Sequence, residues 1–241
     1  MRALVLAAAD HAFESADGGH DTMTSRTMAE RHPGILAIWN DCRAGHEAEF
    51  DAWFQGEHLL ERLAVPGFLF GRRHQAISGN SGYFNFYLVE SPDVLTSKPY
   101  LERLDNPTPM TRKIMSEVFL NMDRTVCRRA LRRGAFRGAF AVTARFNEAP
   151  DASRLTGFLE TIIQDPAVAG GEIWIALDPA GMPVSMEEKL RGGDKKIRGC
   201  LMVDTLRQSD AEAMGARLST QFAESEVGVF RVLCQLGRAD L

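Results

Sequence analysis

The sequence lacks the run of about 18 consecutive apolar residues that a membrane-spanning helix requires, so we expect no membrane span and no membrane partner. It also has little cysteine: Cys42, Cys127, Cys200 and Cys234 are far apart and form no C-x-x-C pair. This spacing argues against a disulfide scaffold or a cysteine-rich zinc site. It favours free thiols in a reducing compartment, which we expect to be the cytoplasm.

Other absences narrow the function. The chain has no excess of basic residues, because its formal net charge is −4, and this argues against a dedicated nucleic-acid binder. There is no glycine-rich phosphate loop, no G-x-S-x-G turn and no H-E-x-x-H helix. The sequence therefore gives no support to a nucleotide cofactor, a serine hydrolase or a zinc protease, and we expect neither a cofactor nor a metal.

What is present is an ordinary globular composition: 241 residues, of which 45% are hydrophobic and 25% charged. The first 33 residues differ from the rest, because a short apolar run at 3–9 is followed by a polar, aperiodic stretch. We expect residues 1–33 to be a disordered extension or the product of a misassigned start codon, with Met23 and Met28 as alternative starts. A weak export signal is the other interpretation, although the apolar run is short for one.

From residue 34 the pattern becomes regular. Short apolar runs alternate with amphipathic segments over 34–133 and predict a β-α-β-β-α-β unit. Pro66 and Gly67 end the first helix, and the glycine-containing stretch 78–82 predicts a hairpin turn. The expected strands are 35–40, 68–77, 83–89 and 124–131, and the expected helices are 46–64, 91–104 and 110–121.

Residues 134–241 give the same order of elements. Identity between the two halves is low, so the repeat is one of element order. The expected strands are 136–146, 171–177, 196–206 and 227–236, the expected helices are 151–164 and 209–222, and a long connection covers 178–195.

Two such units in tandem predict two ferredoxin-like folds of the α+β class. Each unit has helices on one face of its sheet, and the bare face must be covered. The simplest cover is the sheet of the other unit, so the two sheets would close into an α/β barrel within one chain. We expect 34–133 to be the first ferredoxin-like repeat and 134–241 to be the second, with the second acting mainly as the structural partner.

One segment carries a family resemblance: residues 53–73 read W-F-Q-G-E-H-L-L-E-R-L-A-V-P-G-F-L-F-G-R-R. Together with Y-F at 83–84, S-P-x-V-L-x-S-x-x-Y-L at 91–101 and N-P-T-x-x-T at 106–111, it resembles the dimeric α/β-barrel superfamily. Members include EthD-like proteins, muconolactone isomerases and antibiotic-biosynthesis monooxygenases. The resemblance covers about residues 35–130, and Met110 stands where similar sequences often have tryptophan. It implies a fold rather than a reaction, because the superfamily hosts many chemistries.

A haem-binding role is known elsewhere in this superfamily, and it needs an axial ligand. His46 and His74 are the candidates in this chain. No motif marks either of them, so we expect no haem.

The candidate acid–base residue is His58, because an imidazole titrates near neutral pH. It lies four residues before Arg62, so the two side chains share one helix face. Arg72 and Arg73 follow on the next strand, and one of them must face the open side of the sheet, where a substrate carboxylate or enolate would be its partner. The alternatives are a solvated helix surface for His58 and an internal acid as partner of the arginine.

Aromatic and amide side chains predict the rest of a pocket, which we expect in the barrel interior and suited to a flat apolar ligand. For each of them a core or capping role is the alternative. A run of six arginines between 124 and 137 is interpreted as solvated. The candidate substrate-binding residues are Trp39, Asn40, Trp53, Arg62, Tyr83 and Asn106.

These features favour a cofactor-independent enzyme that acts on an aromatic or carbonyl-bearing metabolite, of the isomerase, cyclase, lyase or monooxygenase type. His58 would move a proton, and Arg72 or Arg73 would stabilise the developing oxyanion. A non-catalytic small-molecule binder and an interaction scaffold are the alternatives. A homodimer is a further expectation, because ferredoxin-like sheets leave edges to be covered.

Overall fold

The computed structural model describes residues 32–177 and 184–241, so the extension expected at 1–33 lies almost wholly outside the described residues. The first half of the described chain has strands β1 (Gly34–Cys42), β2 (Phe68–Ser78), β3 (Tyr83–Val89) and β4 (Phe119–Arg133). Its helical segments are α1 (Glu47–Trp53), the π-helical turn η1 (Phe54–His58), α2 (Leu59–Ala64), the 3₁₀ turn η2 (Pro92–Thr96), α3 (Lys98–Asp105), α4 (Pro109–Lys113) and the π-helical turn η3 (Ile114–Val118).

The second half repeats this order. It consists of β5 (Phe140–Phe146), α5 (Ala152–Ile162), β6 (Val168–Ala176), α6 (Met186–Arg191), β7 (Gly199–Thr205), α7 (Gln208–Gln221), β8 (Glu226–Gly237) and the 3₁₀ turn η4 (Arg238–Asp240). Asp151 begins α5, because its carboxylate accepts hydrogen bonds from the backbone N–H groups of Ser153 and Arg154.

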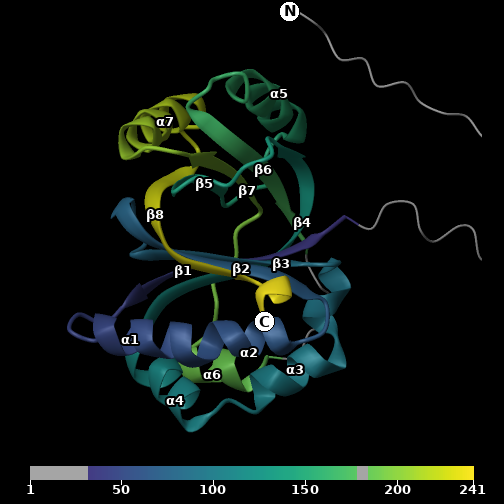
Figure 1. The fold of residues 1–241 in the computed structure, drawn as a ribbon, viewed down its shortest axis with the longest axis vertical. Coiled ribbons are helices and arrows are strands. Elements are labelled where there is room, and N and C mark those ends of the chain that lie inside the picture. Colours follow the sequence, from purple (N-terminus) through teal and green to yellow (C-terminus); the bar gives the residue numbers. More distant parts are fainter. Residues whose placement is uncertain (1–31, 178–183) are drawn as a thin grey trace, which may run out of the picture. The chain divides into compact units, whose positions relative to one another are not determined.

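The eight strands form one closed antiparallel barrel in the order β1-β3-β2-β8-β5-β7-β6-β4. Within each half the strands follow the ferredoxin-like order, and the halves join where β2 pairs with β8 and β4 pairs with β6. Helices α5 and α7 cover the outer face of the second-half sheet. The first-half helices together with α6 cover the outer face of the first-half sheet (Figure 1). The predicted α+β barrel of tandem ferredoxin-like repeats is confirmed.

Alternation along the strands divides the core into three layers. On β3, Phe84 and Phe86 point into the barrel, whereas Tyr83 and Tyr87 point toward the helices. The barrel interior is filled by side chains that include Trp39, Phe84, Phe86, Trp174, Met202 and Phe230. A pocket was expected there, yet in the described part of the chain the aromatic rings stack on one another and fill this space.

Two segments differ from the sequence-based expectation. Strand β4 begins at Phe119 instead of 124, and Asn121 passes through the left-handed region with φ of 50°, next to a register shift between β1 and β4. The connection expected as a loop contains α6, which packs against α3, η3 and β4 of the first half. Long-range packing determines both the earlier start of β4 and the presence of α6. Short polar segments have too little hydrophobic periodicity to predict such packing. No helix in the described residues is long and apolar enough to cross a membrane.

Candidate functional site

A narrow cavity lies between the first-half sheet and the helices that cover it. The space amounts to about 370 Å³, part of it open to solvent, and about 20 Å³ of it admits the centre of a water molecule. Its apolar lining includes Leu36, Ile38, Phe54, Leu104, Met115, Phe119 and Met122. Its polar lining consists of His58, Arg62, Asn85, Tyr87, Tyr100, Arg124, Glu187 and Arg191.

Four of these residues place a buried polar atom without a hydrogen-bond partner among the described residues. The atoms are His58 Nδ1, Arg62 Nη1, Asn85 Oδ1 and Tyr87 Oη. The residues are 6%, 2%, 1% and 1% exposed, so solvent does not satisfy them. Native proteins pair the great majority of such atoms, so four on one cavity indicate a missing partner molecule.

His58 occupies the end of the π-helical turn η1, and turns of this kind occur often at functional sites. Its ring lies 4.3 Å from the ring centre of Trp53, and Phe54 packs beside it. Burial, then the positive charges of Arg62 and Arg191, lower the pKa of His58 well below its ordinary value. The imidazole is therefore neutral at neutral pH. The solvated helix surface considered as an alternative does not describe this residue.

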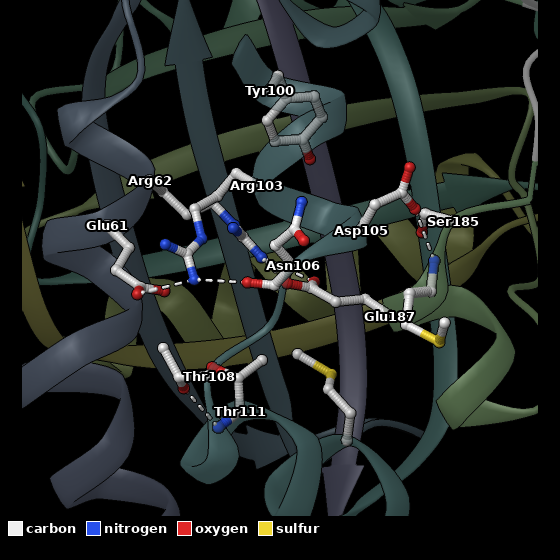
Figure 2. Close-up of polar contacts among 12 residues, drawn as sticks. Glu61, Arg62, Tyr100, Arg103, Asp105, Asn106, Thr108, Thr111, Ser185 and Glu187 are labelled. Carbon is white, nitrogen blue, oxygen red and sulfur yellow. Dashed lines mark hydrogen bonds and ion pairs between the residues drawn. The ribbon is translucent and has the colours of Figure 1, made fainter. Parts of the chain in front are cut away.

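Arg62 is fixed by a residue of the other half. Its Nη2 donates to both carboxylate oxygens of Glu187, at 2.6 and 2.7 Å, and Glu187 belongs to α6. Burial works against the charged guanidinium, but Glu187 outweighs it and keeps the pKa of Arg62 above its usual value. Figure 2 shows Glu187 reaching toward Arg62, next to the pair formed by Arg103 and Glu61. Both hydrogen bonds to Glu187 come from Nη2 of the guanidinium, so Nη1 is available to a molecule in the cavity.

The N-P-T-x-x-T segment supports the π-helical turn. Thr108 and Thr111 both donate hydrogen bonds to Glu57, the residue before His58. Thr111 also accepts a hydrogen bond of 3.0 Å from the indole of Trp53, against which His58 packs. The backbone N–H of Thr111 also donates to the hydroxyl of Thr108 (Figure 2). The two threonines therefore hold the backbone turn and the ring that together set the position of the imidazole.

The two arginines expected in the catalytic set lie away from this cavity. Arg72 faces the barrel interior, where it forms an ion pair of 2.7 Å with Asp204 and donates to the carbonyl of Gly138. Arg73 faces the helices, where Phe50, Phe54 and Tyr83 surround its guanidinium and Asp51 lies 2.8 Å away. Strand alternation alone did not decide which arginine faces inward. Each has an acid of this chain as its partner: Asp204 is internal, as the alternative had it, whereas Asp51 is partly exposed.

Three other predicted residues also lie outside the cavity lining. Trp39 stacks on Phe84 inside the barrel. Tyr83 packs against Arg73. Asn106 is exposed and donates to the backbone carbonyl of Glu102 at the end of α3. The alternative, a cap on the following helix, is also not met, because Thr108 is the N-cap of α4.

The remaining two predicted residues, Trp53 and Asn40, lie behind the cavity wall and contact residues that line it. Trp53 contacts His58 directly. Asn40 accepts a hydrogen bond of 3.1 Å from the side chain of Asn85, and this bond leaves the other atom of that amide facing the cavity.

Sequence reasoning missed six of the polar lining residues: Asn85, Tyr87, Tyr100, Arg124, Glu187 and Arg191. The aromatic strand 83–89 was expected to line the barrel interior, whereas alternation from Tyr83 places Asn85 and Tyr87 together on the other face. Arg124 was taken as part of a solvated basic run, but it lies half-buried at the cavity and donates to Tyr100. Nothing local in the sequence marks Glu187, because its contact with Arg62 spans 125 residues.

The residues do not fit a haem. His74 is fully buried inside the barrel, stacked on Phe84 and Phe86, and its Nδ1–H donates to the backbone carbonyl of Phe84. His46 pairs with Glu49 at the start of α1. Within residues 32–177 and 184–241, no three histidine, cysteine or acidic side chains gather as metal ligands.

No family model matches the chain, and no curated protein matches it significantly. Solved structures do match. An anthrone oxidase-like protein aligns over 88% of this chain and 96% of its own, with a TM-score of 0.58 and 12% identity. A candidate monooxygenase from Fusobacterium nucleatum aligns over 86% and 94%, with a TM-score of 0.55 and 9% identity.

A candidate monooxygenase from Lactobacillus acidophilus aligns over 86% of this chain and 97% of its own, with a TM-score of 0.51 and 6% identity. Identity this low establishes the fold alone. The chain therefore shares its ferredoxin-like α/β-barrel fold with these structures, and membership of the EthD-like group stays a prediction.

Proposed function

We propose that the chain is a small-molecule enzyme that removes a proton from an aromatic or carbonyl-bearing substrate without a bound cofactor, with His58 as the base. The observation that carries this proposal is the convergence of four unpartnered, buried polar atoms on one cavity. Leaving a buried polar atom unpaired costs about 1–3 kcal/mol, so a substrate that pairs with these atoms recovers that cost on binding.

Each atom has a chemical role that follows from its type. The neutral imidazole of His58 accepts the proton of a substrate hydroxyl or of an activated C–H group. Arg62 Nη1 and the hydroxyl of Tyr87 donate to the substrate oxygen on which negative charge then develops. Asn85 Oδ1 accepts a hydrogen bond and so favours a substrate that carries a hydroxyl next to its carbonyl. Arg62 thus takes the part that was expected of Arg72 or Arg73.

The anion left by proton removal can isomerise, cyclise, lose carbon dioxide or react with molecular oxygen. The names of the structural neighbours, anthrone oxidase-like and candidate monooxygenase, favour oxidation among these. For an anthrone-type substrate the balance is one ring methylene and one O₂ giving one ring carbonyl and one water. Oxygen is then the oxidant, and His58 takes the proton in the first step.

The cavity must widen to admit such a substrate, since its free space now suits a water molecule. Met115 and Met122 line it, and unbranched methionine side chains rearrange at low cost. We expect the substrate to displace these two side chains while the polar residues keep their places.

The test is aerobic turnover of 1,8-dihydroxyanthrone, followed by oxygen consumption and by the absorbance of the anthraquinone, with the uncatalysed rate subtracted. We expect wild-type protein and the control His46→Gln to turn over, and His58→Gln to lose about a hundredfold or more in rate. Equal rates in wild-type and His58→Gln protein would overturn the assignment of the base. Binding of the anthrone without turnover in any of the proteins would make the chain a binder instead of an enzyme.

A further inference from the structure

The positive and negative charges of the side chains at the cavity do not cancel. Three guanidinium groups, those of Arg62, Arg124 and Arg191, lie at its wall. Two carboxylates accompany them: Glu187 lines the cavity, and Asp194 binds Arg191. The count leaves one positive charge in excess. Arg103 and Glu61 pair with each other outside this set and leave the count unchanged.

The excess charge can be assigned to one residue. Glu187 binds Arg62 at 2.6 Å, and Asp194 binds Arg191 at 2.8 Å. Arg124 instead donates to the neutral hydroxyl of Tyr100, at 2.7 Å. In residues 32–177 and 184–241, no carboxylate lies within ion-pair distance of Arg124. Burial opposes the charge of Arg124, while Tyr100 and the more distant carboxylates of Asp194 and Glu187 raise its pKa and keep it charged. Neither carboxylate pairs with it directly, so its guanidinium can still take an ion pair, and this wall favours a ligand that brings a negative charge.

The sheet register sets where that charge would lie. Arg124 on β4 stands opposite Ile38 on β1, and Ile38 stands opposite Asn85 on β3. The three residues form one row across the sheet, and two strand spacings separate its ends by about 10 Å. Side chains from both ends face the same cavity. An elongated ligand along this row reaches Arg124 with one end and the polar atoms near Asn85 with the other.

We propose that the cavity takes its substrate as an aromatic carboxylate, with the carboxylate on Arg124 and Tyr100 and the reacting hydroxyl or carbonyl at the opposite end. The inference rests on the proposed function and adds the substrate class. Arg124 anchors the acid from the sheet wall, and His58 acts from the helix wall. Glu187 keeps Arg62 oriented and lowers the net positive charge, so it limits how tightly an anion binds.

The test compares 4-hydroxybenzoate with 4-hydroxybenzamide, which have nearly the same shape but differ in charge, by calorimetric titration at low salt just above neutral pH. We expect wild-type protein to bind the carboxylate about tenfold more tightly than the amide. Arg124→Gln should abolish this preference and leave the affinity for the amide unchanged. Arg129→Gln is the matched control, because Arg129 lies on the same strand and contacts Glu172 instead.

Glu187→Gln is a second variant, which removes one negative charge and substitutes no arginine. It should tighten binding of the carboxylate severalfold, with no gain for the amide. Equal affinity of wild-type protein for both probes would overturn the charge preference and leave the cavity as a binding site. Binding of neither probe would overturn this inference, whereas the proposed function is tested separately by turnover of 1,8-dihydroxyanthrone. A preference that persists in Arg124→Gln would overturn the assignment to Arg124.

Discussion

The two halves of the barrel have the same topology but different layers between sheet and helices. In the second half the centre of this layer is apolar: Val142, Leu155, Leu159, Leu201 and Val203 are 0–1% exposed and belong to one apolar cluster. In the first half the corresponding layer holds an imidazole, a guanidinium, an amide and a phenol around a cavity. The fold therefore does not make the site by itself. The site is made by the side chains that the first-half sheet and its covering helices place between them.

This difference separates stability from function. The second-half layer gains stability from close packing, whereas the first-half layer contains polar atoms that weaken the fold until a ligand pairs with them. A strained or under-satisfied site on a well-packed partner is a common arrangement in enzymes. Substitutions in the second-half layer should accordingly lower stability and leave ligand binding unchanged. Substitutions of the unpaired polar groups in the first-half layer should weaken ligand binding and change stability little.

The largest expected effect is on stability, in the second-half layer. Leu159→Ala removes a fully buried side chain from α5 and should lower the free energy of unfolding by about 3–5 kcal/mol. Leu104→Ala is the matched variant at the cavity, where the side chain already borders open space, and should cost about 2 kcal/mol. Urea unfolding measures both, and equal losses would show that the first-half layer is packed as tightly as the second.

A smaller loss is expected at the support of the π-helical turn. Thr111→Val leaves the indole of Trp53 and the carboxylate of Glu57 each short of a hydrogen bond, so it should cost about 1–3 kcal/mol. It should also lower turnover, because these contacts position His58. Thr161→Val, on an exposed face of α5, should change stability by less than about 0.5 kcal/mol. Full turnover in Thr111→Val would show that the threonine only stabilises the fold.

The pH dependence of stability should come from the first half. All six histidines lie within residues 1–74, and burial first, then nearby arginines, lower the pKa values of His58 and His74 well below 6.5. The unfolded chain binds these protons near pH 6.5 and the native chain does not, so stability is full above that pH and falls below it.

Below that pH, each buried histidine should lower the unfolding free energy by about 1.4 kcal/mol per pH unit. His58→Gln should therefore make this decline less steep, while the contribution of His74 remains. The slope of unfolding free energy against pH is obtained from unfolding measured at several pH values. A change in stability that is the same at every pH does not affect this slope. An unchanged slope would mean that His58 is protonated in the native state.

The smallest effect on stability is expected for Tyr87→Phe. Removing a buried hydroxyl without a partner should leave the unfolding free energy within about 1 kcal/mol of wild type, or raise it. The same change should weaken ligand binding, because it removes a donor to the substrate oxygen. A clear loss of stability would show that the hydroxyl has a partner in the native protein.

The order of elements in the sequence was sufficient to predict the fold. Hydrophobic periodicity and glycine or proline breaks located the strands and most helices, and two bare sheet faces implied the barrel. The position of the site was harder. His58 and Arg62 were chosen correctly as neighbours on one helix, but the pocket was expected inside the barrel, on the wrong face of the sheet.

Physical reasons explain what the sequence left open. Both faces of the first-half sheet are rich in aromatic residues, so composition did not show which face is filled. The position of Glu187 depends on α6 crossing to the first half, a contact between segments distant in the chain. Neither periodicity nor motif spacing carries that information.

The central claim is that the ligand binds in the first-half cavity, and methionine methyl groups test it directly. Met115 and Met122 line the cavity, Met202 lies inside the barrel, and Met214 lies in the second-half layer. Protein labelled with ¹³C at the methionine methyl groups would be titrated with 4-hydroxybenzoate and followed by NMR. The account predicts shifts at Met115 and Met122, with Met202 and Met214 unchanged. Shifts at Met202 or Met214, with Met115 and Met122 silent, would contradict it.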